Sequence, residues 1–123
     1  MKNLIKIIKL HMLAWLCGTA EVHYQLGNIF YVGGTLIPRN YSTAIKWYYK
    51  AAEQGHYDAS YNLGCMYYYG QGVLPDYDKA VKWMRRASRC RVSLASATIE
   101  YWEKIRELCG TTINYNHNEK HEK

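Results

Sequence analysis

The side chains most able to carry out chemistry, the cysteines and histidines, have spacings that match no metal or redox site. The four cysteines include no C-x-x-C pair; they are Cys17, Cys65, Cys90 and Cys109. His117 and His121 are four residues apart and would share a helix face, but the polar stretch around them favours a disordered tail. No Ser-His-Asp set or pair of catalytic carboxylates can be assembled. We therefore predict no enzymatic activity, no metal and no cofactor.

The cysteines also bear on the compartment. Cys109 lies about 22 Å along the predicted helix that follows Cys90, at ~1.5 Å per residue, whereas a disulfide needs α-carbons within about 7 Å. At the amino terminus, Lys6 and Lys9 interrupt the apolar residues, so this segment does not resemble a signal peptide. We expect free thiols, a reducing compartment and a cytoplasmic protein, with a secreted or periplasmic protein as the alternative.

Composition and residue patterning bear on the fold class. The 123 residues include 13 tyrosines and four tryptophans but two prolines, and they show no alternating Val/Ile/Thr runs. This pattern predicts a single all-α domain. The net charge of +6 allows weak attraction to anions but does not define a function.

The tyrosines recur because the chain contains an internal repeat. Shifting the sequence by 37 residues, and by 36 beyond one extra loop residue, aligns two units. The identities include Tyr24/Tyr61, Leu26/Leu63, Gly27/Gly64, Tyr31/Tyr68, Gly34/Gly70, Ala44/Ala80, Trp47/Trp83 and Ala51/Ala87. The same register reaches back over residues 7–18, so we expect the chain to open half way through a repeat. The predicted helices are 4–17, 20–32, 41–54, 57–69, 77–90 and 93–109.

The spacing of small and large residues predicts how the paired helices pack. Ala80, Trp83 and Ala87 lie on one stripe of a helix, with one small residue on each side of a large ring. On the partner helix Gly64 directly follows the core residue Leu63, so the two backbones can approach closely. The glycine costs about 0.5–1 kcal/mol relative to alanine, which burial of the tryptophan offsets.

The other glycines and the acidic or amide residues after them mark helix ends. Gly70 is predicted to stop a helix in the left-handed conformation, and Gly72 belongs to the turn that follows. Asp76 and Asn40 are predicted to cap the next helices by accepting from free backbone N–H groups. The stretch "GQG" is followed by no Gly-Lys-Ser/Thr, so it does not predict a phosphate loop.

The second unit resembles the Sel-one-like repeat, a relative of the tetratricopeptide repeat. The agreeing positions are Ala59, Leu63, Gly64, Tyr67, Gly70, Gly72, Val73, Asp76, Lys79, Ala80, Trp83 and Ala87. The first unit departs from the pattern at Phe30, Leu36, Asn40 and Thr43 and by its extra loop residue. The resemblance implies an α/α superhelix, a short solenoid of helix-turn-helix repeats whose first helices line a concave face. It also implies an adaptor for other proteins, since such families are rarely enzymes.

The resemblance places a partner-binding site on the concave face. The predicted residues are Tyr24, Asn28, Tyr31, Asp58, Tyr61, Cys65, Tyr68 and Tyr69. Tyr68 and Tyr69 are expected to be the most exposed of these. The alternative for Tyr24 and Tyr61 is that they pack between neighbouring units.

Basic residues are concentrated on the predicted helix 77–90 and just after it. They are Lys79, Lys82, Arg85, Arg86, Arg89 and Arg91. We interpret them as a solvated outer face, with Glu100, Glu103 and Glu107 of the last helix as candidate neighbours. Nucleic acid is an unlikely partner because no aromatic-interleaved signature accompanies these residues.

The first helix is apolar nearly all round and lacks the unit that would cover it. We predict self-association through Ile5, Ile8, Met12 and Leu16. Lys2, Lys6 and Lys9 suggest binding to a membrane surface as a rival, less favoured interpretation.

The sequence therefore predicts a repeat domain over residues 1–109. It comprises a half repeat at 4–18, repeats at 20–56 and 57–92, and a terminal helix at 93–109, followed by a disordered polar tail at 110–123. The predicted function is a non-enzymatic protein-interaction module that binds through its concave face. The alternatives are binding or hydrolysis of a small molecule such as a cell-wall fragment, and a truncated structural fragment that self-associates.

Overall fold

The computed structural model describes the backbone of residues 2–89 and 93–119, and the side chains of residues 2–12, 18–89 and 94–110. These ranges contain helices and no strand. The helices are α1 (Lys2–Cys17), α2 (Ala20–Val32), α3 (Tyr41–Glu53), α4 (Tyr57–Tyr69), α5 (Tyr77–Ser88) and α6 (Ser93–Glu119). The first five agree closely with the predicted helices.

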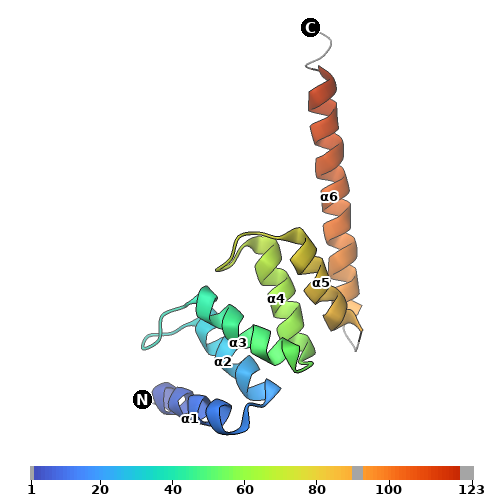
Figure 1. The fold of residues 1–123 in the computed structure, drawn as a ribbon. Coiled ribbons are helices and arrows are strands. Elements are labelled where there is room, and N and C mark those ends of the chain that lie inside the picture. The colour runs from blue at the N-terminus through green and yellow to red at the C-terminus, as the bar shows by residue number, and fades with distance from the viewer. Residues whose placement is uncertain (1, 90–92, 120–123) are drawn as a thin grey trace.

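The helices form a stack that advances in one direction (Figure 1). Helix α2 pairs with α3 and α4 pairs with α5, and these two pairs have the most extensive contacts. Helix α4 also packs on α3, α6 on α5 and α1 on α2. The all-α helical-repeat solenoid that the sequence predicts is confirmed.

The predicted helix ends are also confirmed, with one change of register. The backbone N–H of Thr43 donates to Asn40 Oδ1 and that of Lys79 donates to Asp76 Oδ1, each at 3.0 Å. Gly70 ends α4 with φ 70° and ψ 41°, the left-handed region that glycine adopts without strain. Its counterpart at the end of α2 is Gly33 rather than Gly34 as the sequence alignment predicts. Gly33 also has φ 70°, but its ψ of -179° lies outside the left-handed helical region.

Glycines in the middle of α2 and α4 allow a bulky side chain from the partner helix to lie against the backbone. A Cβ atom at Gly64 would lie 3.1 Å from the Ala80 carbonyl oxygen and 3.0 Å from Met84 Cε. A Cβ atom at Gly27 would meet the ring of Tyr48. Met84 and Tyr48 are 36 residues apart, so the contact is the same in both units. The predicted close approach of the two backbones is confirmed at Gly64, which lies against the Ala80 carbonyl. At Gly27 the neighbour is the ring of Tyr48 rather than an alanine.

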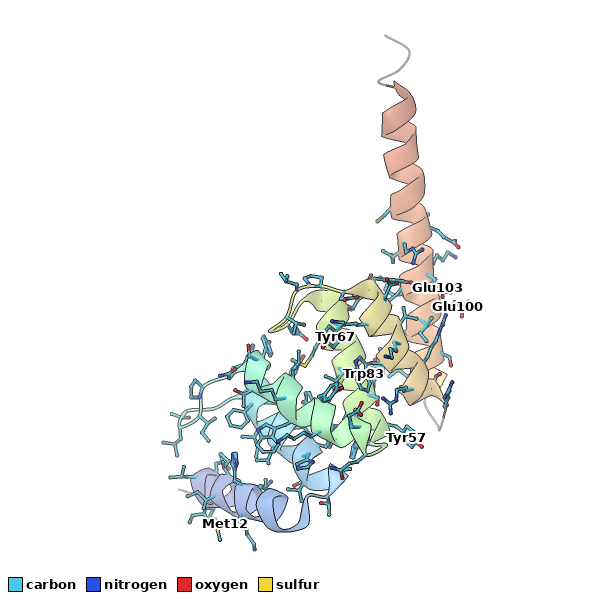
Figure 2. The ribbon with its side chains drawn as sticks, in the orientation of Figure 1. Met12, Tyr57, Tyr67, Trp83, Glu100 and Glu103 are labelled. Carbon is cyan, nitrogen blue, oxygen red and sulfur yellow. The ribbon has the colours of Figure 1, made fainter. Side chains whose placement is uncertain are left out.

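The two repeat tryptophans have matching environments, as the repeat requires. Trp47 lies edge-to-face with His11 of the preceding helix at 5.2 Å, and Trp83 lies edge-to-face with Tyr49 at 5.5 Å. A cation one turn later covers each indole: Lys50 for Trp47 and Arg86 for Trp83. Trp83 is labelled in Figure 2. Trp83 is buried and Trp47 is half-buried.

The buried core continues across the units and into α6. One cluster joins Ala59, Leu63 and Met66 of α4 to alanines and Tyr48 of α3. A second cluster joins Ala95 and Trp102 of α6 to α5. Ala59 and Met66 precede Ala95 and Trp102 by 36 residues each, so α6 occupies the place of the first helix of a further unit.

The predicted end of the last helix is wrong. Helix α6 runs to Glu119 rather than residue 109, and it extends beyond the other helices (Figure 1). Residues 110–119, predicted as a disordered tail, contain no proline, and Gly110 has no left-handed backbone angle that would end the helix. Residues 120–123, including His121, lie outside the described residues.

The glycine contact predicts that replacing glycine with alanine has opposite effects on stability at positions 64 and 110. Gly64→Ala should lower the free energy of unfolding by about 1–3 kcal/mol, because the new methyl group meets backbone and side-chain atoms of α5. Gly110→Ala is the matched control, since a Cβ atom there has no neighbour within 4 Å. It should stabilise by about 0.5–1 kcal/mol. Urea unfolding of both variants tests this; equal stabilisation by both would contradict the packing role of Gly64.

Candidate functional site

The predicted binding residues lie on α2 and α4, the first helices of the two units. Side chains connect α2 to the start of α4, and others connect α4 to α6. These three helices are therefore the elements that position the candidate site. We refer to their common surface as the first-helix face.

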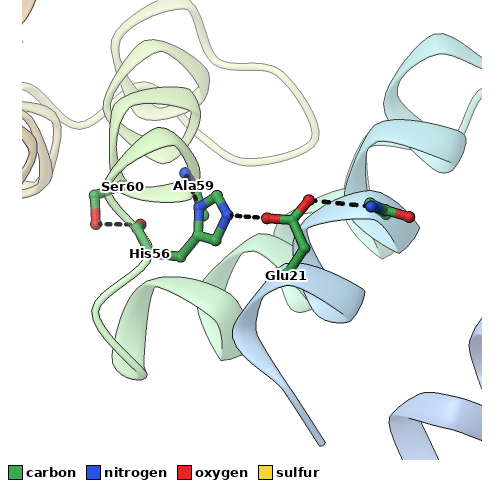
Figure 3. Close-up of polar contacts among 5 residues, drawn as sticks. Glu21, His56, Ala59 and Ser60 are labelled. Carbon is green, nitrogen blue, oxygen red and sulfur yellow. Dashed lines mark hydrogen bonds and ion pairs between the residues drawn. The ribbon is translucent and has the colours of Figure 1, made fainter.

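At the junction of α2 and α4, the imidazole of His56 makes three contacts at once, of which Figure 3 shows the two polar ones. Its Nε2 lies 2.9 Å from Glu21 Oε2, and its Nδ1 accepts from the backbone N–H of Ala59 at 3.3 Å. The ring of Tyr24 stacks on the imidazole at 4.3 Å. The neutral tautomer with a proton on Nε2 satisfies both polar contacts. Tyr24 therefore packs between the units, which is the alternative that the sequence analysis left open.

The contacts at this junction stabilise the ionised form of Glu21. Hydrogen bonds from His56, and then from Gln25, lower the pKa of the Glu21 carboxyl below its ordinary value of 4.5. Sequence reasoning did not identify His56 as a capping and bridging residue, because histidine is not a typical helix cap.

Asn28 and Tyr31 of α2 are half-buried and bonded within the chain. Asn28 Oδ1 accepts from the hydroxyl of Tyr48 at 2.7 Å. Burial of Tyr48 raises the pKa of its phenol well above the ordinary value, so the hydroxyl stays a donor. The Tyr31 hydroxyl donates to Gln71 Oε1 at 3.4 Å, and the Tyr31 ring lies 5.3 Å from that of Tyr41.

Helix α6 covers part of the candidate site on α4. The ring of Tyr68 stacks on Trp102 with centroids 4.2 Å apart and planes at 3°. Burial raises the pKa of the Cys65 thiol and of the Tyr61 phenol, which is also hydrogen-bonded to Thr98. The prediction that Tyr68 is exposed is wrong, because Trp102 of the following helix lies against it.

The first-helix face retains an exposed aromatic pair. Tyr69 is 63% exposed and packs edge-to-face on Tyr68 at 5.0 Å. Tyr101 of α6 is 61% exposed. The sequence analysis missed Tyr101, although extending the repeat by 36 residues from Cys65 would have placed it on this face. Asp58, the remaining predicted residue, is exposed at the start of α4.

The basic residues of α5 face an open hollow between α5 and α6. Its lining includes Lys82, Arg85 and Arg89 together with Glu103 and Arg106 of α6. The carboxylate of Glu53 pairs with Arg86 at 3.4 Å. The neighbouring positions of α5 cations and Glu103 agree with the interpretation of a solvated, charged outer face.

Within the described side chains, no three metal-ligating groups lie together. Cys65 and Cys109 are free. The side chains of Cys17, Cys90 and His117 lie outside the described residues. Among the residues searched, no helix combines the length and the apolar character needed to cross a bilayer.

The Glu21–His56 contact predicts a pH-dependent stability difference. A lowered carboxyl pKa contributes stability at neutral pH, and this contribution is lost as the pH falls through the lowered pKa. Glu21→Gln should therefore cost up to about 1 kcal/mol at neutral pH, since Glu21 is solvent-exposed. The cost should vanish in strong acid. Thermal unfolding of the wild type and of Glu21→Gln from neutral pH to strong acid tests the prediction. A stability difference that does not change with pH would contradict it.

Known proteins with this arrangement identify the family. The model of the Sel1 repeat matches residues 20–56 and 58–91, close to the two predicted units. An uncharacterised protein of Neisseria meningitidis serogroup B is 46% identical over 54 residues, which are 44% of this chain and 11% of that protein.

Solved structures also resemble this chain, and one of them is a Sel1 repeat protein. A Sel1 repeat protein of Oxalobacter formigenes is 34% identical with a TM-score of 0.66, over 69% of this chain and 24% of that one. The protective antigen c5321 of uropathogenic Escherichia coli is 32% identical with a TM-score of 0.66, over 72% of this chain and 19% of that one. Cysteine-rich protein B of Helicobacter pylori shares the fold at 22% identity. The TM-score is 0.72 over 80% of this chain and 72% of that one.

The chain thus spans a small part of the Neisseria, Oxalobacter and Escherichia proteins that it matches. The family model covers more than half of its residues, and the contacts that define the repeat are present in both units. The chain belongs to the Sel1 repeat family.

Proposed function

We propose that this chain is a protein-interaction module that binds a segment of another protein across its first-helix face. Sel1 repeat proteins are generally protein-interaction modules, and their fold is typically a non-catalytic scaffold. The observation that carries the proposal is the exposed pair Tyr69 and Tyr101, on adjacent helices of this face.

The aromatic pair rests on a rigid support. The Tyr69 ring packs edge-to-face on Tyr68 at 5.0 Å. Burial raises the pKa of the Tyr68 phenol, and the phenols of Tyr69 and Tyr101 raise it further. Tyr68 is itself held by its stack on Trp102. Aromatic side chains supported in this way bind with little loss of conformational freedom, and such residues dominate the energy of many interfaces.

An enzyme or small-molecule binder is the less supported alternative. Such a site usually encloses its ligand in a deep cavity with convergent polar groups. The two hollows found among the described residues are both open to solvent. An open surface is better suited to an extended segment of a protein.

The proposal predicts that peptide binding depends on the exposed pair. Peptides selected from a random display library on the wild-type protein should bind Tyr69→Ser and Tyr101→Ser at least about tenfold more weakly, because each change removes an aromatic anchor. Leu74→Ser is the control, since Leu74 is 88% exposed in the α4–α5 loop. Fluorescence anisotropy gives the affinities. Failure to select any peptide, or equal binding by all three variants, would contradict the proposal.

A second proposal concerns the outer face of α1. Ile7 and Leu10 are buried, whereas Leu4, Ile5, Ile8 and Met12 form an exposed stripe. Ile5, Ile8 and Met12 belong to the predicted self-association set; the side chain of Leu16 lies outside the described residues. We propose that a second copy of the chain covers this stripe, since an exposed apolar patch is typical of an interaction surface.

Self-association through α1 predicts a loss of dimers when the stripe becomes charged. Ile5→Glu with Ile8→Glu should shift the protein from dimer to monomer in analytical ultracentrifugation, while Leu74→Glu leaves it dimeric. A wild-type protein that stays monomeric at the highest attainable concentration would contradict this proposal. Co-flotation of such a monomer with anionic vesicles would favour the membrane-surface interpretation.

A further inference from the structure

An open groove lies between the first turns of α1, helix α2 and the loop that follows α2. Its volume is about 830 Å³, within the ~300–1,000 Å³ range of ligand-binding sites. The residues that define its chemistry are Lys2, Lys6, Asn28, Ile29, Val32 and Leu36. It adjoins the first-helix face, because Val32 is exposed and precedes Tyr69 by 37 residues in the repeat.

The groove exists because the two units differ in one loop. In the second unit Gly72 lies against the start of α3: a Cβ atom there would be 2.7 Å from the Tyr41 carbonyl carbon. Ser42 Oγ also donates to the Gly72 carbonyl at 3.5 Å. The corresponding loop of the first unit faces the start of α1, and Thr35 and Leu36 stand where the second unit has glycine. These side chains prevent the same close approach.

The polar groups of the groove favour an anion. Lys2 and Lys6 are one helical turn apart, and they are the charged residues in its lining. Helix α1 contains no acidic residue, and neither lysine belongs to an ion pair found among the described side chains. The Tyr48 hydroxyl holds the Asn28 carbonyl oxygen, which orients the N–H donors of the same amide.

The apolar groups of the groove favour a ligand that also has hydrophobic side chains. Val32 and Leu36 are both more than 60% exposed, and Ile29 is half-buried beside Val32 on α2. Exposed aliphatic residues next to lysines that pair with no described carboxylate match a segment in which carboxylates neighbour apolar side chains. A free inorganic anion would leave this apolar surface uncovered.

The geometry points to a partner segment that places Asp or Glu next to Leu, Ile, Val or Phe in this groove. The inference rests on the proposed function, since it names the chemistry of the segment bound by the first-helix face. Lys2 and Lys6 select the acidic residues, and the loop of the first unit supplies the apolar contact. The groove thus gives one end of the face its specificity.

Parallel peptide selection on the wild type and on two variants of equal net charge tests the inference. A random dodecapeptide library is selected in parallel on the wild type, on Lys2→Gln/Lys6→Gln and on the control Lys46→Gln/Lys104→Gln, which removes two exposed lysines elsewhere. Circular dichroism melting establishes that all three proteins fold. Wild-type and control selections should be enriched in Asp or Glu beside an apolar residue, and the Lys2/Lys6 variant should lose this enrichment.

Affinities then separate this inference from the proposed function. A selected acidic peptide should bind the Lys2/Lys6 variant about tenfold more weakly than the control, and added salt should weaken its binding to the wild type. Peptides that depend on Tyr69 and Tyr101 but show no acidic enrichment would overturn the inference and leave the proposed function intact. Acidic enrichment that persists in the Lys2/Lys6 variant would also overturn it.

Discussion

The stack depends on one steric constraint: a glycine in the first helix of each unit must lie under a bulky side chain of the second helix. Gly27 faces Tyr48, and Gly64 faces Met84 and the backbone of Ala80. The small residue brings the paired helices close together, and the alanines of α3 and α5 are then completely buried. Because both units make the same contact, the next helix meets a similar surface each time and the chain advances in one direction.

The same stacking decides which tyrosines remain available to a partner. Tyr24 and Tyr68 each lie against a ring of the next first helix, His56 in one case and Trp102 in the other. The tyrosines that look alike in the sequence therefore divide into those that hold units together and those that stay exposed. The helices α1 and α6 also differ in their exposed surfaces: α1 exposes an apolar stripe, whereas Glu100 of α6 is exposed at the place where earlier units have the glycine (Figure 2).

Much of the fold follows from the sequence because its signals are local. Asn40, Asp76, Gly64 and Gly70 act within a few residues or within one helix pair, so their roles are predictable. The exposure of Tyr68 is not local, since it depends on α6, whose sequence no longer follows the repeat at Glu100. The groove beside Leu36 was not predictable either, because it depends on how the loop of the first unit lies relative to α1.

A double-mutant cycle between Gly27 and Tyr48 tests the central contact most directly. Gly27→Ala is measured by urea unfolding in the wild type and in Tyr48→Ala, which removes the ring that a Cβ atom at position 27 would meet. If the glycine serves this contact, Gly27→Ala destabilises the wild type but is neutral or stabilising in Tyr48→Ala. The coupling energy should then be at least about 1 kcal/mol. An equal effect of Gly27→Ala in both backgrounds would contradict the account.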